Sequence, residues 1–449
     1  MFRAIFVTGF VLTRRHNKLN IVYFSTRRGL RGRDATTGTT FRNRNPLVAG
    51  RSTQGVNQQP TSDERLLAGY PGRMLVTVSL AWAVLQTGRF LLSPLLPTII
   101  EELQITEATA GIALALFQGV YAVTQYPGGE YSDRWTRATL IVPGLGILVL
   151  GFATFGLAGG LAGFVAAAVI TGLGKGLFAI PSRALLSDLF VERRGRALGL
   201  YAAGTDLGGL VSSGLAILAL TYATWRTPFL PVAVVLAGLT VLYAFWSREG
   251  YAVGSPELHV SGTLRRLFAS AEQRRTLLAF GLFYFMVGGV INFFPTYLIE
   301  AKGFDQQLAS ATFAIVFAVG ITIKPVAGGL SDRFRRESIA VVGMLVAAGA
   351  LAVLSAVEAR PLIYVSVVAL AAGYKTEFPL ADAIIMDNAP DADRGADLGG
   401  ARALFLGANA LGPAYVGIVA TYASYVAAFA GLAVCLVVAA GLLYWDARK

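Results

Sequence analysis

Twelve long apolar segments recur along most of this chain, and they constrain its fold more than any other feature. Each has about 20 residues, enough for a helix to cross a hydrocarbon core of roughly 30 Å. With 55% apolar and 14% charged residues, the composition is also unlike that of soluble domains. The sequence therefore predicts an all-α integral membrane protein. The approximate spans are 74–97, 107–127, 138–158, 161–189, 197–220, 228–246, 277–299, 308–327, 338–357, 361–388, 398–421 and 424–446.

The second half of the chain repeats the first at an offset of about 200 residues. The stretch GEYSDRWTR, from Gly129 to Arg137, returns as GGLSDRFRR, from Gly328 to Arg336. In both copies a glycine lies four residues before an Asp-Arg pair, and a further arginine closes the run. The repeat predicts two homologous bundles of six transmembrane helices. Other matched positions are Lys175 with Lys375, Asp188 with Asp387, and Arg194 with Arg394.

We expect four regions along the chain. Residues 1–72 form a basic extension, 73–247 the N-terminal bundle, 248–276 a cytoplasmic linker, and 277–449 the C-terminal bundle. The extension is rich in polar residues and is expected to be disordered. It also suits an organelle transit peptide or a weak secretory signal. A start assigned too early, with the protein beginning near Asp63 or Met74, is an equal alternative.

Basic residues at the segment ends predict the orientation, because loops rich in arginine and lysine stay on the cytoplasmic side. The ends on one side, including both repeated motifs and the linker, carry most of the arginines. The opposite side offers only Arg226, Lys302 and Arg360. We therefore expect a multi-pass protein of the cell membrane with both termini in the cytoplasm.

The composition excludes several other classes of protein. The net charge of +12 resides mainly in the extension, so it does not indicate nucleic-acid binding. The single cysteine, Cys435, allows neither an internal disulfide nor a cysteine-based metal site. Both histidines, His16 and His259, lie outside the apolar segments, and no phosphate-binding loop is present. We predict no enzymatic activity, no metal and no cofactor.

The two halves, the basic linker and the repeated Gly-x-x-x-Asp-Arg-x-x-Arg motif resemble the major facilitator superfamily. The resemblance covers residues 73–449 and includes ERRGRALG, from Glu192 to Gly199. It implies a secondary transporter whose halves rock around a binding site near the bilayer midplane. The family motif assigns gating roles to Gly129, Asp133, Arg134 and Arg137, and to Gly328, Asp332, Arg333 and Arg336.

The expected gating contacts follow from charge. Asp133 would cap a helix of the other half near Leu398, and Arg134 or Arg137 would pair with Asp188. In the second half, Asp332, Arg333 and Asp387 would repeat these contacts. We expect them to form only when the cytoplasmic side is shut. A solvated turn that merely sets topology is the alternative.

Charged residues inside the apolar segments are candidates for function, because each costs at least about 2.5 kcal/mol unless it meets a partner or a water-filled cavity. The segments 138–158, 228–246 and 338–357 contain none, and 424–446 contains only Asp446 at its last position, which suits outer, lipid-facing helices. Among the charges within the other segments we select Arg89, Lys175, Arg183, Asp206, Lys324, Lys375, Glu377 and Asp382.

Positive charges exceed negative ones near the middle of the segments, which favours an anionic substrate. Candidate substrate-binding residues are Arg89, Lys175, Lys375, Asn292 and Tyr121. The alternative is that Lys175 merely pairs with Asp206, and Lys375 with Asp382, which is seven residues further along the same helical face. Lys324 is assigned a gating or structural role.

Buried acids are candidates for carrying a coupling proton, and we select Asp206 and Glu377. The sequence thus predicts a monomeric carrier of a small organic anion, working by proton or sodium symport or by exchange. Alternatives are proton-driven efflux of drugs or other amphipathic compounds, carriage of a neutral solute such as a sugar, and a sensor that binds ligand without moving it.

Overall fold

The structure of the chain is a computed structural model that describes residues 9–15, 18–24, 65–252, 260–388 and 394–447. It divides into two units, Met1–Pro60 and Thr61–Lys449. Side chains are not described at 9–15, 18–24, 126–130, 133–134, 260–261, 263–264, 388, 394–396 and 446–447.

The first unit contains a two-stranded antiparallel sheet. Strands β1 (Gly9–Arg15) and β2 (Lys18–Phe24) pair so that Val11 lies opposite Val22 and Leu12 opposite Ile21. We expected disorder throughout residues 1–72, and these strands correct that expectation at their own positions. The physical reason is local, because β-branched and aromatic residues in both segments favour extended, paired backbone.

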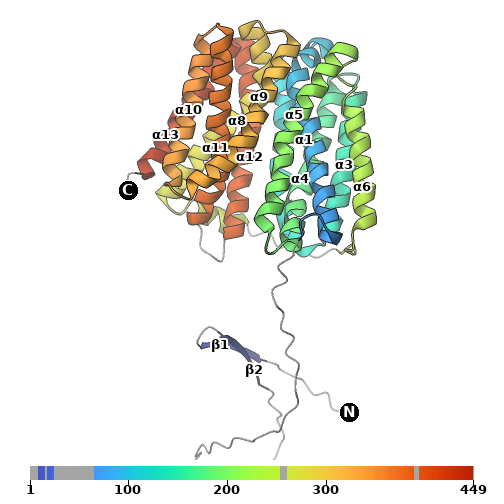
Figure 1. Ribbon diagram of the computed structural model, residues 1–449, viewed down its shortest axis with the longest axis vertical. Coiled ribbons are helices and arrows are strands. Elements are labelled where there is room, and N and C mark those ends of the chain that lie inside the picture. The colour runs from blue at the N-terminus through green and yellow to red at the C-terminus, as the bar shows by residue number, and fades with distance from the viewer. Residues whose placement is uncertain (1–8, 16–17, 25–64, 253–259, 389–393, 448–449) are drawn as a thin grey trace, which may run out of the picture. The chain divides into compact units, whose positions relative to one another are not determined.

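The second unit is a bundle of long helices (Figure 1), and one short helix separates its two halves in the sequence. The first half contains α1 (Gly69–Leu103), α2 (Glu107–Arg134), α3 (Arg137–Leu157), α4 (Leu161–Leu189), α5 (Arg194–Tyr222) and α6 (Phe229–Trp246). The short helix is α7 (Val260–Leu267). The second half contains α8 (Ala271–Lys302), α9 (Gln306–Ser331), α10 (Arg336–Ala356), α11 (Arg360–Asn388), α12 (Arg394–Tyr422) and α13 (Tyr425–Ala447).

In the part of the chain that the structure describes, eleven helices are long and apolar enough to cross a membrane. The twelfth long helix, α11, has 29 residues, but Lys375, Glu377 and Asp382 lower its hydropathy. Helices α1 to α6 and α8 to α13 therefore form two bundles of six, and the predicted membrane fold is confirmed.

Some helix bounds differ from the predicted spans. Helix α8 begins at Ala271, six residues before the predicted start, because the Ser270 hydroxyl accepts a hydrogen bond from the Gln273 amide at 3.0 Å and caps the helix. The repeated motif begins inside helices and not in loops, since α2 continues to Arg134 and α9 to Ser331.

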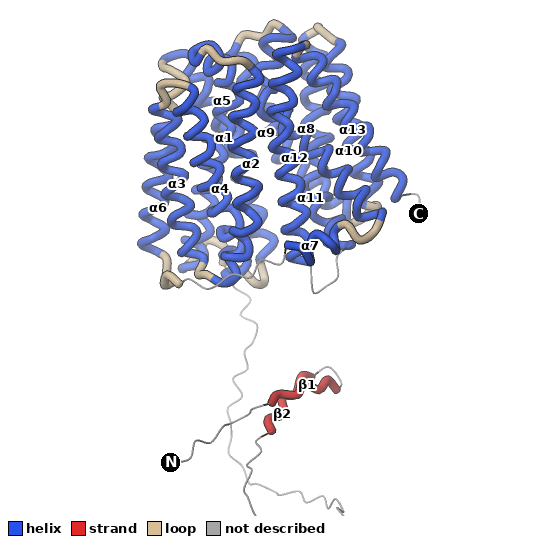
Figure 2. The backbone as a smooth tube through the Cα atoms, turned by 180° about the vertical axis from the view of Figure 1, so that it is seen from behind, coloured by secondary structure: helices blue, strands red, loops and turns tan. Residues whose placement is uncertain are grey.

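The halves meet where α2 packs along α12 and α5 along α9 (Figure 2). Helices α3 and α6 pack behind α4 and α1, and α10 and α13 pack behind α11 and α8. These four outer helices expose apolar side chains, such as Val241 and Phe245 of α6. Their positions agree with the absence of ionisable residues from the predicted outer spans.

Candidate functional site: a basic cavity between the halves

A cavity of about 590 Å³ lies between the two halves. Its wall is formed by α1, α2, α4 and α5 from the first half and by α8, α9, α11 and α12 from the second. This volume suits a small molecule. Because each half contributes four helices, a ligand in the cavity would contact both.

The cavity wall is strongly basic. Its charged residues comprise six basic and two acidic side chains, an excess of four formal positive charges. Basic side chains come from both halves, so the excess is not confined to one face. The basic residues are Arg89, Lys175, Arg183, Lys324, Lys375 and Arg402, and the acidic residues are Asp206 and Asp382.

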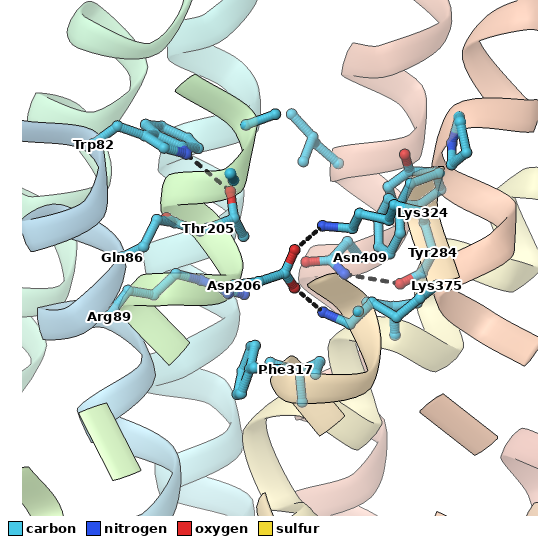
Figure 3. Close-up of a pocket in the computed structure, with 18 of the residues that line it drawn as sticks. Trp82, Gln86, Arg89, Thr205, Asp206, Tyr284, Phe317, Lys324, Lys375 and Asn409 are labelled. Atoms are coloured by element: carbon cyan, nitrogen blue, oxygen red, sulfur yellow. Dashed lines mark hydrogen bonds and ion pairs between the residues drawn. The ribbon is translucent and has the colours of Figure 1, made fainter. Parts of the chain in front are cut away.

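Asp206 on α5 connects the halves by bonding two lysines of the second half (Figure 3). Its Oδ1 accepts a hydrogen bond from Lys375 Nζ of α11 at 2.7 Å, and its Oδ2 accepts one from Lys324 Nζ of α9. Nearby, Trp82 Nε1 of α1 donates to the Thr205 hydroxyl at 2.9 Å and holds α5 against α1. The Asp206 carboxylate is thus fixed between two ammonium groups.

The other acid of the wall, Asp382, is paired within the second half. Arg402 of α12 donates to both of its carboxylate oxygens, with an Nε to Oδ1 distance of 2.9 Å. A two-point pair of this kind is the strong form of an arginine–carboxylate contact. Both acids of the cavity are therefore occupied by basic residues of the second half.

The basic residues of the first half have no carboxylate partner among the described side chains. Arg89 lies over Phe90, Lys175 lies over Tyr121, and Arg183 lies between Trp82 and Tyr201. The Lys175 Nζ is 4.2 Å from the Tyr121 ring centroid. The Arg89 Nε is buried and has no hydrogen-bond partner in the described residues. These contacts are cation–π contacts, which leave the positive charges uncompensated.

Amide side chains add neutral polar groups to the wall. Gln118 of α2 donates to Asn409 of α12 at 2.6 Å, and Asn409 donates to the Tyr284 carbonyl at 2.9 Å. This chain of hydrogen bonds also joins the two halves at the depth of the cavity.

The end of the bundle opposite the linker is closed. Gln306 of α9 donates to the Pro94 carbonyl and the Thr98 hydroxyl of α1. The Ala108 amide of α2 donates to the Thr421 hydroxyl of α12 at 3.0 Å. A side chain at Gly417 would clash with the backbone of α2, so the helices are in close contact there.

The cavity is reached from the linker end. Side-chain exposure is 2% at Asp206 but 27% at Lys324, 31% at Asp382 and 30% at Arg402. Of these, Asp382 and Arg402 lie nearest the loop that joins α11 to α12 on the linker side. Solvent therefore enters from the side of the repeated motifs.

The structure brings together four of the five predicted substrate-binding residues. Arg89, Lys175, Lys375 and Tyr121 line the cavity. Asn292 does not, because its side chain donates to the Gly288 carbonyl within α8 at 2.7 Å.

The pairings considered from sequence are wrong. Lys375 pairs with Asp206 and not with Asp382, and Lys175 lies over aromatic rings and not against Asp206. Helical spacing suggested the pair of Lys375 with Asp382, but it could not show that α5 approaches α9 and α11 across the interface.

The two predicted proton-coupling acids have different surroundings. Asp206 lines the cavity between its lysines, whereas Glu377 lies outside the cavity wall, against Gly343 of α10. Glu377 is fully buried, and neither of its carboxylate oxygens has a hydrogen-bond partner among the described residues.

The predicted gating pairs are formed in part. Arg137 pairs with Asp188 at 3.1 Å, and Arg336, in place of the expected Arg333, pairs with Asp387. Both pairs lie within one half and coexist with a cavity open on their side, so the expectation that they need a shut end is wrong for them. Gly328 lies in the last turns of α9, Asp332 and Arg333 are exposed, and the side chains of Gly129, Asp133 and Arg134 are outside the described set.

Sequence reasoning missed Arg402 and undervalued Lys324. Arg402 lies four residues inside the predicted span 398–421 and could have been counted among the intramembrane charges. Lys324 was set aside as gating or structural because it lies close to the second motif, but its ammonium group reaches the centre of the cavity.

Relatives and solved structures match over much of the chain. The probable sulfoacetate transporter SauU of Cupriavidus necator is 27% identical over 59% of this chain and 66% of its own length. Multidrug resistance protein D of Escherichia coli is 26% identical over 55% of this chain and 62% of its own length. The chain thus spans just under two thirds of each of these relatives.

Solved structures share the fold. A bacterial homolog of the human lysosomal transporter Spinster, in an inward-facing and occupied conformation, superposes with a TM-score of 0.73 at 17% identity. That match covers 84% of this chain and 97% of the other. A D-xylose–proton symporter gives a TM-score of 0.70 at 16% identity over 84% of this chain and 98% of that protein.

The family model of the Major Facilitator Superfamily matches residues 78–374 and 321–449, which together include all twelve long helices apart from the first part of α1. Its members are transporters and not enzymes, which agrees with the expectation from sequence. The chain is a multi-pass membrane protein that belongs to the Major Facilitator Superfamily.

Proposed function

We propose that this chain carries a small organic anion across the membrane by alternating access, with the basic cavity as its binding site. The observation that supports this proposal is the set of three basic residues that have no carboxylate partner among the described side chains, Arg89, Lys175 and Arg183. Positive charges inside a membrane are costly, so a bound anion would offset a cost that the protein alone leaves uncompensated.

Arg89 is the residue best suited to hold the anion. A guanidinium group binds a carboxylate or sulfonate through two parallel hydrogen bonds, whereas a lysine acts as a point charge. Lys175 lies over Tyr121 and adds a second charge on the same half. We propose that Arg89 orients the anionic group and that Lys175 strengthens its binding.

The relative from Cupriavidus necator supports an anionic substrate. Its name gives sulfoacetate, a small molecule with one carboxylate and one sulfonate group. The chemical class of that substrate agrees with the charge of the cavity.

We further propose that the structure represents the inward-facing state. The end opposite the linker is sealed by Gln306 and Thr421, and the linker end is open. With the linker, both repeated motifs and both termini in the cytoplasm of a cell-membrane protein, the cavity opens inward. We propose a monomer, because one chain supplies the whole wall.

Coupling to protons is proposed for Glu377. A charged carboxylate without a partner is costly in a protein interior, and Glu377 has none among the described residues. Asp206 is the less suitable carrier, since two lysines already neutralise it. If Glu377→Gln keeps uptake that is driven by a pH gradient, another group carries the proton. If the unmodified chain shows no such uptake, sodium coupling or exchange replaces this proposal.

A second candidate, efflux of amphipathic compounds, is favoured by the aromatic part of the wall and by the relatives named as multidrug resistance proteins. Under this alternative the basic residues would matter little. An apolar cation or neutral drug would move, and Arg89→Gln would leave its rate nearly unchanged.

The decisive experiment is uptake into proteoliposomes of labelled sulfoacetate, succinate, a phosphate ester, xylose and an amphipathic cation. We expect anion uptake, and loss of about 10- to 100-fold of it in Arg89→Gln, since a charged hydrogen bond contributes about 1.5 to 3 kcal/mol. Arg360→Gln is the matched control, because Arg360 lies over Phe304 outside the cavity. Transport of only neutral or cationic probes would refute the proposal.

A further inference from the structure

We propose that the transported anion carries two negatively charged groups, and that Asp206 occupies the place of the second group until the substrate arrives. This inference rests on the function proposed above and defines its substrate class. It makes the lysine pair of the second half part of the binding site and not merely a link between the halves.

The lysine pair holds Asp206 as it would hold a ligand. Lys324 and Lys375 each bond one oxygen of the same carboxylate, which enters from the other half of the protein. Gly320 of α9 provides the space for this contact, because a Cβ there would lie 2.7 Å from Asp206 Oδ1 and 3.0 Å from Lys375 Cε. Figure 3 shows the carboxylate between the two ammonium groups.

The pair is accessible to a solute. Lys375 is almost fully buried, but the Lys324 side chain is 27% exposed and faces the cavity. Among the described residues, Asp206 is the carboxylate that bonds these two lysines. An external carboxylate or sulfonate that enters from the linker end can therefore compete with Asp206 for the same two ammonium groups.

The other anion position lies on the first half, at Arg89 and Lys175. One anionic group bound there and a second on the lysine pair would connect the halves through the substrate. A singly charged substrate would fill the first position and leave Asp206 on the lysines. Because a doubly charged substrate would bridge the two positions, its binding would depend on how the halves are arranged, which a ligand must do to shift their equilibrium.

Displacement of Asp206 does not leave it without a counter-charge. The wall carries six basic side chains, and three of them have no carboxylate partner in the described part of the chain. The exchange thus replaces one carboxylate by another on the lysines and keeps the released one in a basic environment. The apparent affinity of the lysine pair for a substrate is proportional to the fraction of time that Asp206 leaves the pair free.

The test is equilibrium binding to the purified full chain, with the dicarboxylates malonate, succinate and glutarate compared with propionate and butyrate. We expect one dicarboxylate to bind at least about tenfold more tightly than either monocarboxylate, as two charge-assisted contacts replace one. This comparison uses the unmodified protein, so it does not depend on any variant folding.

Variants then locate the second group. Lys324→Gln and Lys375→Gln should weaken dicarboxylate binding about tenfold and leave monocarboxylate binding within about twofold. Asp206→Asn removes the internal competitor and should tighten dicarboxylate binding about tenfold. Glu102→Gln is the control, since it removes a carboxylate paired with Arg226 at the closed end.

The outcomes separate the two proposals. If monocarboxylates bind as tightly as every dicarboxylate, or if Asp206→Asn weakens dicarboxylate binding in a folded protein, the two-group inference is wrong while anion transport stands. If no anion binds to the unmodified chain and a neutral or cationic probe does, the proposed function itself fails.

Discussion

Lys175 and Lys375 occupy corresponding positions in the two repeated halves, but their surroundings differ. Lys175 of α4 lies over the Tyr121 and Phe117 rings and has no carboxylate partner among the described residues. Lys375 of α11 bonds Asp206 at 2.7 Å. Both side chains are almost fully buried, so burial does not distinguish them.

The same contrast holds for the whole cavity. Within the described part of the chain, the three basic residues of the first half have no carboxylate partner, and the three of the second half are all paired. The repeated fold supplies similar frameworks, and the placement of two acids determines which half has free positive charge. A binding site with one free and one occupied set of cations can distinguish ligands by the number of their charges.

Neutralising Lys175 and Lys375 in turn gives the largest expected difference in the free energy of unfolding. Lys375→Gln removes a partner of a buried carboxylate and should lower the free energy of unfolding by about 3 kcal/mol, the lower end for a broken buried pair because Lys324 remains. Lys175→Gln removes an uncompensated buried charge and should leave this free energy unchanged or raise it by about 1 kcal/mol. Denaturant titration in mixed micelles measures both.

A lysine outside the cavity serves as the control for these substitutions. Lys302 donates to the Ser355 and Val357 carbonyls at the end of α10 and lies outside the cavity. Lys302→Gln should lower stability by about 1 kcal/mol, the contribution of ordinary hydrogen bonds. If Lys175→Gln and Lys375→Gln lowered the free energy of unfolding equally, the proposed difference between the two halves would be wrong.

A double-mutant cycle tests the pair itself with a smaller expected effect. Asp206→Asn combined with Lys375→Gln should be less destabilised than the sum of the single changes, by about 1 to 2 kcal/mol of coupling. The same cycle with Lys175 in place of Lys375 should show coupling near zero. Coupling at Lys175 would mean that the first half also compensates its charge through Asp206.

Much of the fold could be predicted from the sequence. The length of the apolar segments fixes the number of helices, because a bilayer requires about 20 apolar residues for each crossing. The repeat around Gly129 and Gly328 fixes the pairing of the two halves. The uncharged spans identified the outer helices, since a lipid-facing helix cannot carry an isolated charge.

The site could be predicted only in part. Arg89, Lys175 and Lys375 were found because intramembrane charge requires a cavity or a partner, but their partners depend on contacts between distant helices. Helical spacing relates Lys375 to Asp382, whereas the bond to Asp206 requires α5 and α11 to approach each other around α9. Glu377 illustrates the same limit, because its residue type gave no sign that it faces α10 and not the cavity.

The smallest expected effect concerns Gly320 of α9, where the lack of a side chain leaves room for the pair of Lys375 and Asp206. Replacing an exposed helical glycine by alanine normally stabilises by about 0.5 to 1 kcal/mol. Gly329→Ala on the same helix should show this gain, because nothing lies within 4 Å of the added Cβ. Gly320→Ala should lose it, since the new Cβ would lie 2.7 Å from Asp206 Oδ1 and would displace the ion pair. Thermal unfolding of both variants in detergent measures the difference. An equal gain in stability at both positions would mean that the pair of Lys375 and Asp206 moves aside at no cost and is not held in place by α9.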